Sequence, residues 1–194
     1  MIKVILFVLG IALVGFIAVQ IYAMKAQNKI ESYSYTVDKS YGNFEIRSYE
    51  ASLFTSVKLP MKNYKKGSSE GFSILAEYIF GGNDKNEKIS MTSPVTVSLE
   101  DTMTMMFLVP KKFNKESLPK PNQSKVEFRE EPKKTVAAIT FGGWADDENI
   151  EIYKNQLISL LKKEGIKHTN KFSFLGYNPP FEVFNRKNEV IVEL

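Results

Sequence analysis

The feature that most constrains this chain is an uncharged apolar run at its N-terminus. From Val4 to Met24 only Gln20 is clearly polar, and Lys3 and Lys25 flank the run. About twenty apolar residues are enough for a helix to cross the hydrocarbon core of a bilayer. The run has no polar face, so a buried helix of a soluble core is the least favoured interpretation. The sequence therefore predicts a membrane-spanning helix at residues 4–24, followed by a domain that folds separately.

A cleaved secretory signal is the alternative to a permanent anchor. Signal peptides usually have a shorter apolar stretch and small residues before the cleavage site. Here Ala23 follows Ile21 by two positions and Ala26 follows Met24, so neither site fits well. We therefore favour an uncleaved single-pass anchor and divide the chain into three parts. These are an anchor or signal segment at residues 1–25, a polar tether at 26–40 and a domain at 41–194.

The side of the membrane that receives the domain is less constrained. Lys3 precedes the apolar run, while Lys25 and Lys29 come after it, so the basic residues that orient a membrane helix are nearly balanced. A very short N-terminal tail is compatible with export of the C-terminal domain. The absence of cysteine suits an exported domain. We expect the domain to be extracytoplasmic, and periplasmic if the source is bacterial.

Charge and residue types argue against several classes of function. The net charge is +4, and acidic and basic residues are interspersed without a basic stripe interleaved with aromatic residues, so nucleic-acid binding is not indicated. The chain has no cysteine and one histidine, which disfavours a zinc or non-haem iron site. No serine has a base beside it in sequence, which disfavours a hydrolase. The oligomeric state is not predicted.

The order of predicted elements occurs twice along the domain. The first half has strands at 44–47 and 53–59, a helix that Ser68 or Ser69 caps and that ends at Gly81-Gly82, and strands at 89–99 and 102–109. The second half has strands at 126–129 and 135–141, a helix at 148–163 that Asp146 or Asp147 caps, and strands at 172–177 and 189–194. Two such halves, each with an apolar sheet face, are expected to close around a shared core as an α+β barrel.

Three features are candidates for binding chemistry. His168 is the one imidazole available as a ligand to iron or as a pH-sensitive group, although an exposed loop histidine is the simpler interpretation. The turn at Asn178-Pro179-Pro180 has a rigid backbone, and Tyr177 beside it is placed to wall a cleft. Arg186 is placed to meet a carboxylate at the rim, unless this turn only delivers the last strand into register. Met91, Met103, Met105 and Met106 crowd the middle strands as core filler or as a pliable pocket wall.

Eight short motifs, in this order, resemble the SOUL haem-binding protein family over residues 41–194. They are Phe44-Glu45-Ile46-Arg47-Ser48-Tyr49, Tyr78-Ile79-Phe80-Gly81-Gly82-Asn83, Ile89-Ser90-Met91-Thr92-Ser93-Pro94-Val95, Met106-Phe107-Leu108-Val109-Pro110, Pro119-Lys120-Pro121, Phe141-Gly142-Gly143, Gly176-Tyr177-Asn178-Pro179-Pro180-Phe181 and Arg186-Lys187-Asn188-Glu189-Val190. The resemblance implies a duplicated, distorted β-barrel with two flanking helices, of the SOUL and GyrI-like kind.

The same resemblance implies a haem or tetrapyrrole ligand in an apolar cleft beside the first helix of the domain. By resemblance, the candidate contacts are Phe72, Leu75, Tyr78, Ile79 and Met91, and Lys65 and Lys66 are candidate partners for the propionates. The chain departs from the family pattern in one respect: residues 68–80 contain no basic residue, where members thought to bind propionates through this helix have them.

The function expected from the sequence is therefore a membrane-tethered haem or tetrapyrrole carrier, buffer or sensor, and not an enzyme. Two alternatives stay open. One is a binding module for other hydrophobic molecules, because a fold alone does not determine its ligand. The other is a hydrolase acting on such a ligand, which needs an acidic residue such as Glu77 or Glu127 buried in the cleft.

Overall fold

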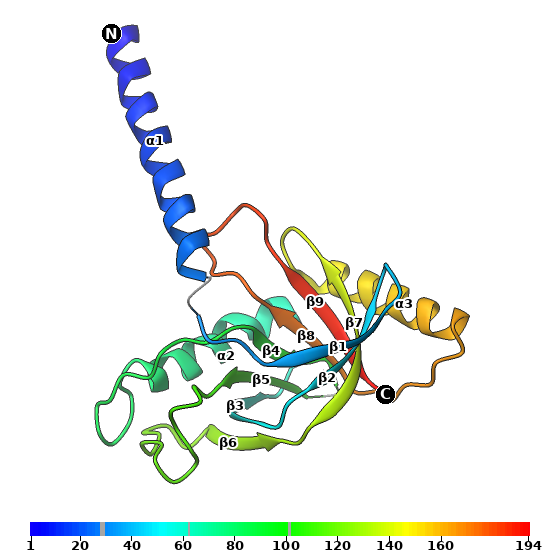
Figure 1. The fold of residues 1–194 in the computed structure, drawn as a ribbon. Coiled ribbons are helices and arrows are strands. Elements are labelled where there is room, and N and C mark those ends of the chain that lie inside the picture. Colours follow the sequence, from blue (N-terminus) through cyan, green and yellow to red (C-terminus); the bar gives the residue numbers. More distant parts are fainter. Residues whose placement is uncertain (28–29, 62, 101) are drawn as a thin grey trace.

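The domain is a curled antiparallel sheet with two helices packed on it, and a third helix projects from it (Figure 1). The computed structural model describes residues 1–27, 30–61, 63–100 and 102–194. The elements are α1 (Ile2–Gln27), β1 (Tyr35–Ser40), β2 (Glu45–Tyr49), β3 (Ser52–Leu59), α2 (Tyr64–Ile79), β4 (Val95–Ser98), β5 (Met103–Leu108), β6 (Val126–Glu131), β7 (Lys134–Phe141), α3 (Asp147–Lys163), β8 (Phe172–Gly176) and β9 (Asn188–Glu193).

The order of the strands shows the predicted duplication. Within the described residues the sheet runs β1-β2-β7-β9-β8-β4-β5-β3-β6. If β1 is left out, each strand has an equivalent strand at the same distance from the other end of the sheet. The equivalent pairs are β2 and β6, β7 and β3, β9 and β5, and β8 and β4. An approximate two-fold axis therefore passes between β4 and β8, where the two halves join as an antiparallel pair. The predicted order of strands, helix and strand pair in each half is confirmed.

Two very short connections force the sheet to curl. Residues 50–51 alone join β2 to β3, and residues 132–133 alone join β6 to β7, yet each pair of strands lies near opposite ends of the sheet. A chain of that length spans only about 10 Å between the strands it joins, so the two ends of the sheet must come together. The contacts agree: Lys133 Nζ lies 3.6 Å from Glu50 Oε1, and the ring of Tyr33 lies 5.1 Å from that of Phe54.

The two faces of the curled sheet carry separate apolar clusters. One cluster lies between the sheet and the helices and includes Met103 and Met105. The other lies on the opposite face and includes Met106. The split follows the alternation of side chains along β5 that the sequence predicts. Because the second cluster joins Tyr49 of β2 to Phe54 of β3, it lies on the inner face of the curl.

The two helices of the domain pack on equivalent strands, α2 on β3 and β5 and α3 on β7 and β9. Helix α3 begins after Asp146, whose side chain accepts from Asn149 N, as the sequence predicts. The predicted start of α2 is wrong. Asn63 caps it, accepting from Lys66 N, so the helix begins a turn before Ser68.

The strand predicted at 89–99 also needs correction, because β4 covers only Val95–Ser98. Ser93 cannot extend this strand, since its N–H donates to Glu31 O and its carbonyl accepts from Tyr33 N, both at 3.0 Å. The residues just before the sheet therefore run beside Ser93. Part of the stretch predicted as a tether belongs to the sheet, because 35–40 form its edge strand and Tyr33 is buried.

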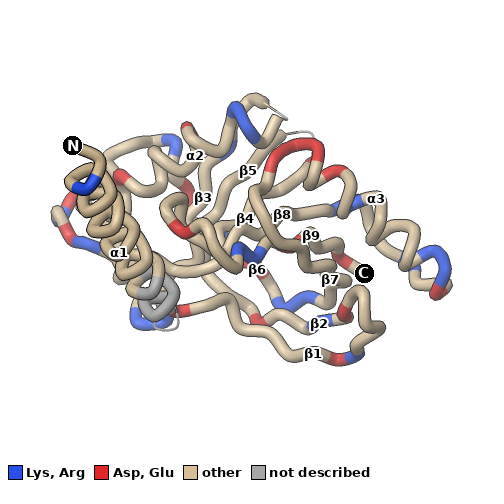
Figure 2. Tube along the Cα trace, turned by 90° about the horizontal axis from the view of Figure 1, so that it is seen from above, with Lys and Arg blue, Asp and Glu red and all other residues tan. Residues whose placement is uncertain are grey.

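Helix α1 covers the predicted membrane-spanning segment and projects from the domain (Figure 1). Residues 2–20 are long and apolar enough to cross a membrane, and residues 2–19 are exposed, whereas Gln20 is buried against the domain. Seen from above, Lys and Arg alternate with Asp and Glu along the domain (Figure 2), in agreement with the interspersed charges of the sequence.

The close approach of α2 to the sheet generates a prediction. A Cβ on Gly71 would lie 2.9 Å from Leu59 Cδ1 and 3.3 Å from Met105 Cβ, so a side chain there has no room. We expect Gly71→Leu to lower the free energy of unfolding by about 1–3 kcal/mol through overpacking. The exposed Ser73→Leu on the same helix serves as the control and should change it by less than about 0.5 kcal/mol. Urea unfolding in mild detergent, followed by Trp144 fluorescence, measures both. Equal unfolding free energies of the two variants would contradict the tight packing of α2 on the sheet.

Candidate functional site

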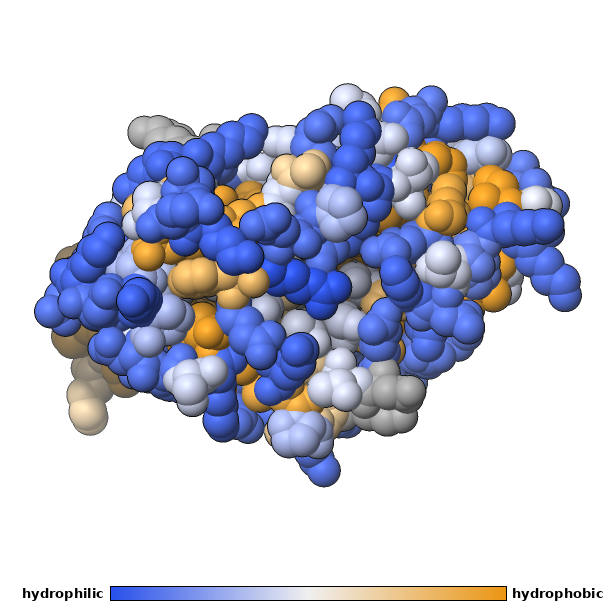
Figure 3. Space-filling model, turned by 90° about the horizontal axis from the view of Figure 1, so that it is seen from below, coloured by the Kyte–Doolittle hydropathy of each residue, from blue (hydrophilic) through white to orange (hydrophobic). Residues whose placement is uncertain are grey.

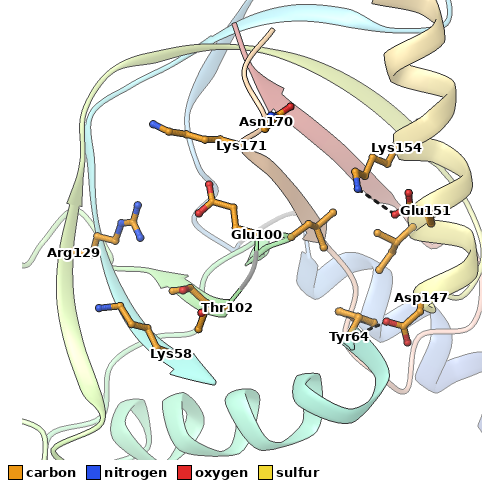
Figure 4. Close-up of a pocket in the computed structure, with 13 residues that line it drawn as sticks. Lys58, Tyr64, Glu100, Thr102, Arg129, Asp147, Glu151, Lys154, Asn170 and Lys171 are labelled. Atoms are coloured by element: carbon orange, nitrogen blue, oxygen red, sulfur yellow. Dashed lines mark hydrogen bonds and ion pairs between the residues drawn. The ribbon is translucent and has the colours of Figure 1, made fainter. Parts of the chain in front are cut away.

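A pocket of about 800 Å³ opens at the end of the curled sheet where β3 ends and both helices of the domain begin (Figure 4). Its walls come from β3, β5, β6, α3, the start of α2, the β4–β5 turn and the residues before β8. The lining residues are Lys58, Tyr64, Leu99, Glu100, Thr102, Thr104, Arg129, Asp147, Ile150, Glu151, Lys154, Asn170 and Lys171. A cavity of this size is in the range of sites for small organic ligands.

Asp147 builds the floor of the pocket by joining the two helices. It is the first residue of α3, and its carboxylate accepts from Tyr64 N at 2.6 Å and Lys65 N at 3.2 Å at the start of α2. A carboxylate is favourable there because the free N–H groups of a helix start carry partial positive charge. The Tyr64 ring packs edge-on against Phe174, and burial raises the pKa of Tyr64. Tyr64, Leu99 and Ile150 give the pocket its apolar surface.

Four cations line the same pocket, and each has an acidic neighbour. Lys58 pairs with Glu127 at 3.2 Å, Lys171 with Glu193 at 3.2 Å and Lys154 with Glu151 at 3.3 Å. Arg129 pairs with Glu131. Side-chain exposure is 61% for Lys58, 64% for Lys171 and 50% for Arg129. Ion pairs this exposed contribute little, about 0–1 kcal/mol. Lys58 and Lys171 can therefore exchange their partners for an anionic ligand at low cost. Glu131, the partner of Arg129, is buried, and it keeps Lys134 Nζ as a second cation at 2.8 Å.

The sheet has a C-terminal half, β2-β7-β9-β8, in which three of four strands come from the second repeat, and an N-terminal half, β4-β5-β3-β6. A second polar cluster lies buried on the inner face of the C-terminal half. Arg47 of β2 reaches across β7 and donates to Glu189 of β9 at 2.9 Å. The Glu189 side chain has no exposed surface, and it also accepts from Tyr177 Oη at 2.7 Å and Thr140 Oγ1 at 3.1 Å. Lys187 Nζ lies 3.0 Å from Oε1 of Glu189, the oxygen that Thr140 also contacts. Both carboxylate oxygens are therefore bonded within the protein.

Charge interactions decide the protonation state of this cluster. Burial acts to raise the pKa of Glu189, but the hydrogen bond and charge of Arg47 lower it below its ordinary value. Burial acts to lower the pKa of Arg47, while the bond to Glu189 raises it overall. Burial raises the pKa of Tyr49 beside them to about 12. The pair is therefore ionised at neutral pH and the tyrosine is neutral.

Comparison with known proteins assigns the chain to a family. Residues 30–193 match the family model described as SOUL heme-binding protein. The chain belongs to the SOUL heme-binding protein family. It is 27% identical over 155 residues to Heme-binding protein 1 of Xenopus laevis, covering 76% of this chain and 81% of that protein. It is 30% identical over 158 residues to Heme-binding protein 2 of Homo sapiens, covering 77% of each. The EcmrR C-terminal domain shares the fold with a TM-score of 0.61 at 12% identity, covering 82% of this chain and 96% of that domain.

The helix contacts that the SOUL resemblance implies are mostly part of the core. Leu75, Tyr78 and Ile79 are buried between α2 and the sheet, and Tyr78 Oη donates to Pro119 O at 2.9 Å. Phe72 is half-buried and packs on Phe107, while Met91 is half-buried against the same cluster. None of these side chains lines the pocket. Their contact with a ligand stays a prediction.

The remaining predicted residues lie around the pocket and at the β8–β9 loop. Lys65 and Lys66 are exposed in the first turn of α2, directly after Tyr64 of the pocket. Arg186 donates to Pro179 O and Glu182 O and stacks on the ring of Trp144 at 4.1 Å. Tyr177 bonds to Glu189 in the buried cluster.

His168 lies just before the pocket residues Asn170 and Lys171, half-exposed. Its Nδ1 is 2.6 Å from Thr169 O, and its ring meets Phe172 edge-on. Among the described residues no three His, Cys, Asp or Glu side chains are grouped to hold a metal ion.

The acidic residues required by the hydrolase hypothesis are not buried. Glu77 is exposed and bonds to Gln123, and Glu127 is exposed and pairs with Lys58. Neither has the buried position that the hypothesis requires. Sequence reasoning missed Lys58, Arg129 and Lys171 as pocket residues. Strand alternation placed Lys58 and Arg129 on one face of their strands, but only the curl of the sheet makes that face an interior.

The buried pair yields a mutational prediction. We expect Glu189→Gln to lower the free energy of unfolding at pH 7 by about 3 kcal/mol, the lower end for breaking a buried pair, because the buried Arg47 keeps only the partly exposed Glu45 as an acidic partner. Glu127→Gln removes an exposed carboxylate from a similar pair and should cost less than about 1 kcal/mol. Urea titration of both variants in detergent checks this, and equal losses would show that Glu189 does not stabilise the fold.

The Glu189 carboxylate makes the free energy of unfolding depend on pH. Because its folded pKa lies below the ordinary 4.5, the stability it contributes is complete above that pH and is lost as the pH falls through the lower folded value. Glu131, whose pKa is also lowered by Lys134 and Arg129 against the effect of burial, acts in the same direction. Unfolding free energies of the unchanged chain should fall from about pH 4.5 downward, and Glu189→Gln should fall less steeply. Parallel curves would assign the acid sensitivity to other groups.

Proposed function

We propose that this protein is a membrane-tethered carrier, buffer or sensor of haem or a related tetrapyrrole, which it binds in the pocket at the open end of the sheet. The observation that carries the proposal is the 800 Å³ pocket with Lys58, Arg129 and Lys171 on one side and Tyr64, Leu99 and Ile150 on the other. Haem is a flat apolar macrocycle with two propionates, so it needs apolar walls and cations together. Membership of the SOUL family and the names of its relatives support the same ligand.

The residues present fit the propionates and part of the ring. Asn170 and Lys171 line the pocket, and His168 precedes them by two residues, which makes this imidazole the candidate axial ligand. Bound haem would supply iron-centred redox and ligand chemistry. In the role we assign to the protein, Lys58 and Arg129 would pair with the carboxylates of the macrocycle, and Tyr64 would supply apolar contact to it.

A haem titration of the full chain in lipid nanodiscs tests the proposal. Empty nanodiscs of the same lipid serve as the blank, because lipid itself takes up haem. We expect saturation at one equivalent with a shifted Soret band, and His168→Ala should weaken that band if the imidazole ligates iron. A Lys162→Ala variant at the far end of α3 is the control and should titrate as the unchanged chain does. Absorbance that rises without saturation, as in the blank, would reject the ligand.

The tether rests on α1 and on the loop that it contacts. Gln20, the polar residue of the apolar run, donates to Phe181 O at 3.0 Å and accepts from Val183 N at 3.1 Å. One helical turn earlier, Phe16 packs edge-on against Phe184. Figure 1 shows the β8–β9 loop beside the lower turns of α1.

The exposed side chains of this loop are apolar at the level where α1 leaves the domain. Phe181, Val183 and Phe184 are exposed, and so is Trp144, which stacks on Arg186 at the end of the loop. The opposite face of the domain is mostly hydrophilic, with smaller apolar patches (Figure 3). If α1 spans the bilayer, Phe16 lies about 6 Å deeper than Gln20 along the helix, so the loop meets the bilayer surface and its aromatic side chains enter the interface.

Native Trp144, the one tryptophan of the chain, reports on this arrangement. In proteoliposomes we expect flotation with the lipid after carbonate washing and quenching of Trp144 by lipids brominated near the carbonyl groups. A Ser124→Trp probe in a Trp144→Phe background is the control, because Figure 1 places the β5–β6 loop away from α1; it should stay unquenched. Loss of the protein from the floating fraction would reject the tether. Flotation with equal quenching of both probes would reject this orientation of the domain.

A further inference from the structure

The duplication places Arg47 and Arg129 at equivalent positions on the inner face. In the C-terminal half, Arg47 of β2 lies opposite Val136 of β7. In the N-terminal half, Arg129 of β6 lies opposite Phe54 of β3. The palindromic strand order exchanges β2 with β6 and β7 with β3, so the two arginines correspond. Both side chains also pair with a glutamate two residues away on their own strand.

The next strand completes the correspondence. Four positions further along β7 (136 to 140), Thr140 lies opposite Glu189 of β9. Four positions further along β3 (54 to 58), Lys58 lies opposite Thr104 of β5. Thr104 therefore occupies the place in the N-terminal half that Glu189 occupies in the other. The carboxylate that the C-terminal half supplies from its own chain has no counterpart on β5.

The two positions differ in what surrounds them. The carboxylate of Glu189 is held by Arg47 and Thr140, with Tyr177 and Lys187 beside it, and it is fully buried. Lys58, Thr104 and Arg129 instead line the open pocket. Figure 4 shows Lys58 and Arg129 extending from neighbouring strands on the same side of that pocket. One half of the domain thus contains a filled carboxylate site. The other has the equivalent arginine, Arg129, at the open pocket, with Lys58 at the position of Thr140 as a second cation.

We propose that Arg129 and Lys58, with the Thr104 hydroxyl, form a receptor for a carboxylate of the bound ligand, at the position where Glu189 sits in the duplicated half. A guanidinium and an ammonium on neighbouring strands present a charge-assisted set of donors to one carboxylate. The proposal rests on the proposed function and names the chemical class: a flat apolar molecule with at least one carboxylate. The ester of such a molecule lacks the recognised group.

Acidic side chains near these cations set the strength of the site. Glu127 and Glu131 pair with Lys58 and Arg129, and a ligand carboxylate joins or displaces them. Glu100, on the β4–β5 turn, extends into the pocket on the side of Arg129 and Lys171 (Figure 4). Because Glu100 repels a second carboxylate, its removal should strengthen binding of an anionic ligand, whereas removal of Arg129 should weaken it.

Protoporphyrin IX and its dimethyl ester test the proposal without the iron. Both are titrated into the full chain in nanodiscs, with empty nanodiscs as the blank, and binding is followed by porphyrin fluorescence. We expect Arg129→Gln and Lys58→Gln each to weaken binding of the free acid about tenfold and to leave the ester unchanged. Glu100→Gln should tighten the free acid about threefold and also leave the ester unchanged. Lys115→Gln, which removes a cation from a similar exposed pair with Glu130 outside the pocket, is the control.

The outcomes separate this proposal from the function on which it rests. Free acid and ester of equal affinity, unaffected by Arg129→Gln, would overturn the carboxylate receptor and leave tetrapyrrole binding in place. The same loss in Lys115→Gln would reduce the effect to general charge attraction and would also overturn it. Absence of saturable binding of either porphyrin to the unchanged chain would overturn the proposed function and the receptor together. Urea midpoints of each variant confirm that affinity is compared between folded proteins.

Discussion

Two short connections between strands at opposite ends of the sheet determine the architecture of the domain. Because residues 50–51 and 132–133 must bridge from one end of the sheet to the other, an open, flat arrangement is impossible for this strand order. The sheet has to curl, and the curl creates an inner face that a flat sheet would expose. The apolar cluster around Tyr49 and Phe54, the Arg47–Glu189 pair and two cations of the pocket, Lys58 and Arg129, lie on that face.

The inner face is filled differently in its two halves. A buried ion pair costs desolvation free energy, and an apolar pair of the same shape is often no less stable. The net contribution of the Arg47–Glu189 pair to stability is therefore less important than the strands that it connects. It connects β2 to β9 across β7 and so holds a strand from the beginning of the domain onto its C-terminal half. The equivalent Arg129 has no such internal partner on β5 and faces the pocket instead.

The N-terminal helix and the pocket are linked through loops and not through the core. Gln20 of α1 bonds to the β8–β9 loop, and Arg186 of that loop stacks on Trp144, three residues before Asp147 of the pocket floor. Asp147 in turn holds the start of α2. A short series of contacts therefore runs from the end of the apolar helix to the pocket floor.

The sequence by itself determined the apolar helix, the order of elements in each half, a capping aspartate at position 146 or 147 before α3, and the family. Apolar periodicity, capping residues and motifs are local signals. It did not determine the extent of β4, the start of α2 at Asn63 or the strand at 35–40, since tertiary hydrogen bonds decide all three. The pocket was decided by the tertiary structure alone. Lys58, Arg129 and Lys171 are far apart in the chain and look like solvated surface charges, and only the closure of the sheet brings them around one cavity. Side-chain alternation reveals which residues share a face, but long-range strand pairing decides which face becomes the inside.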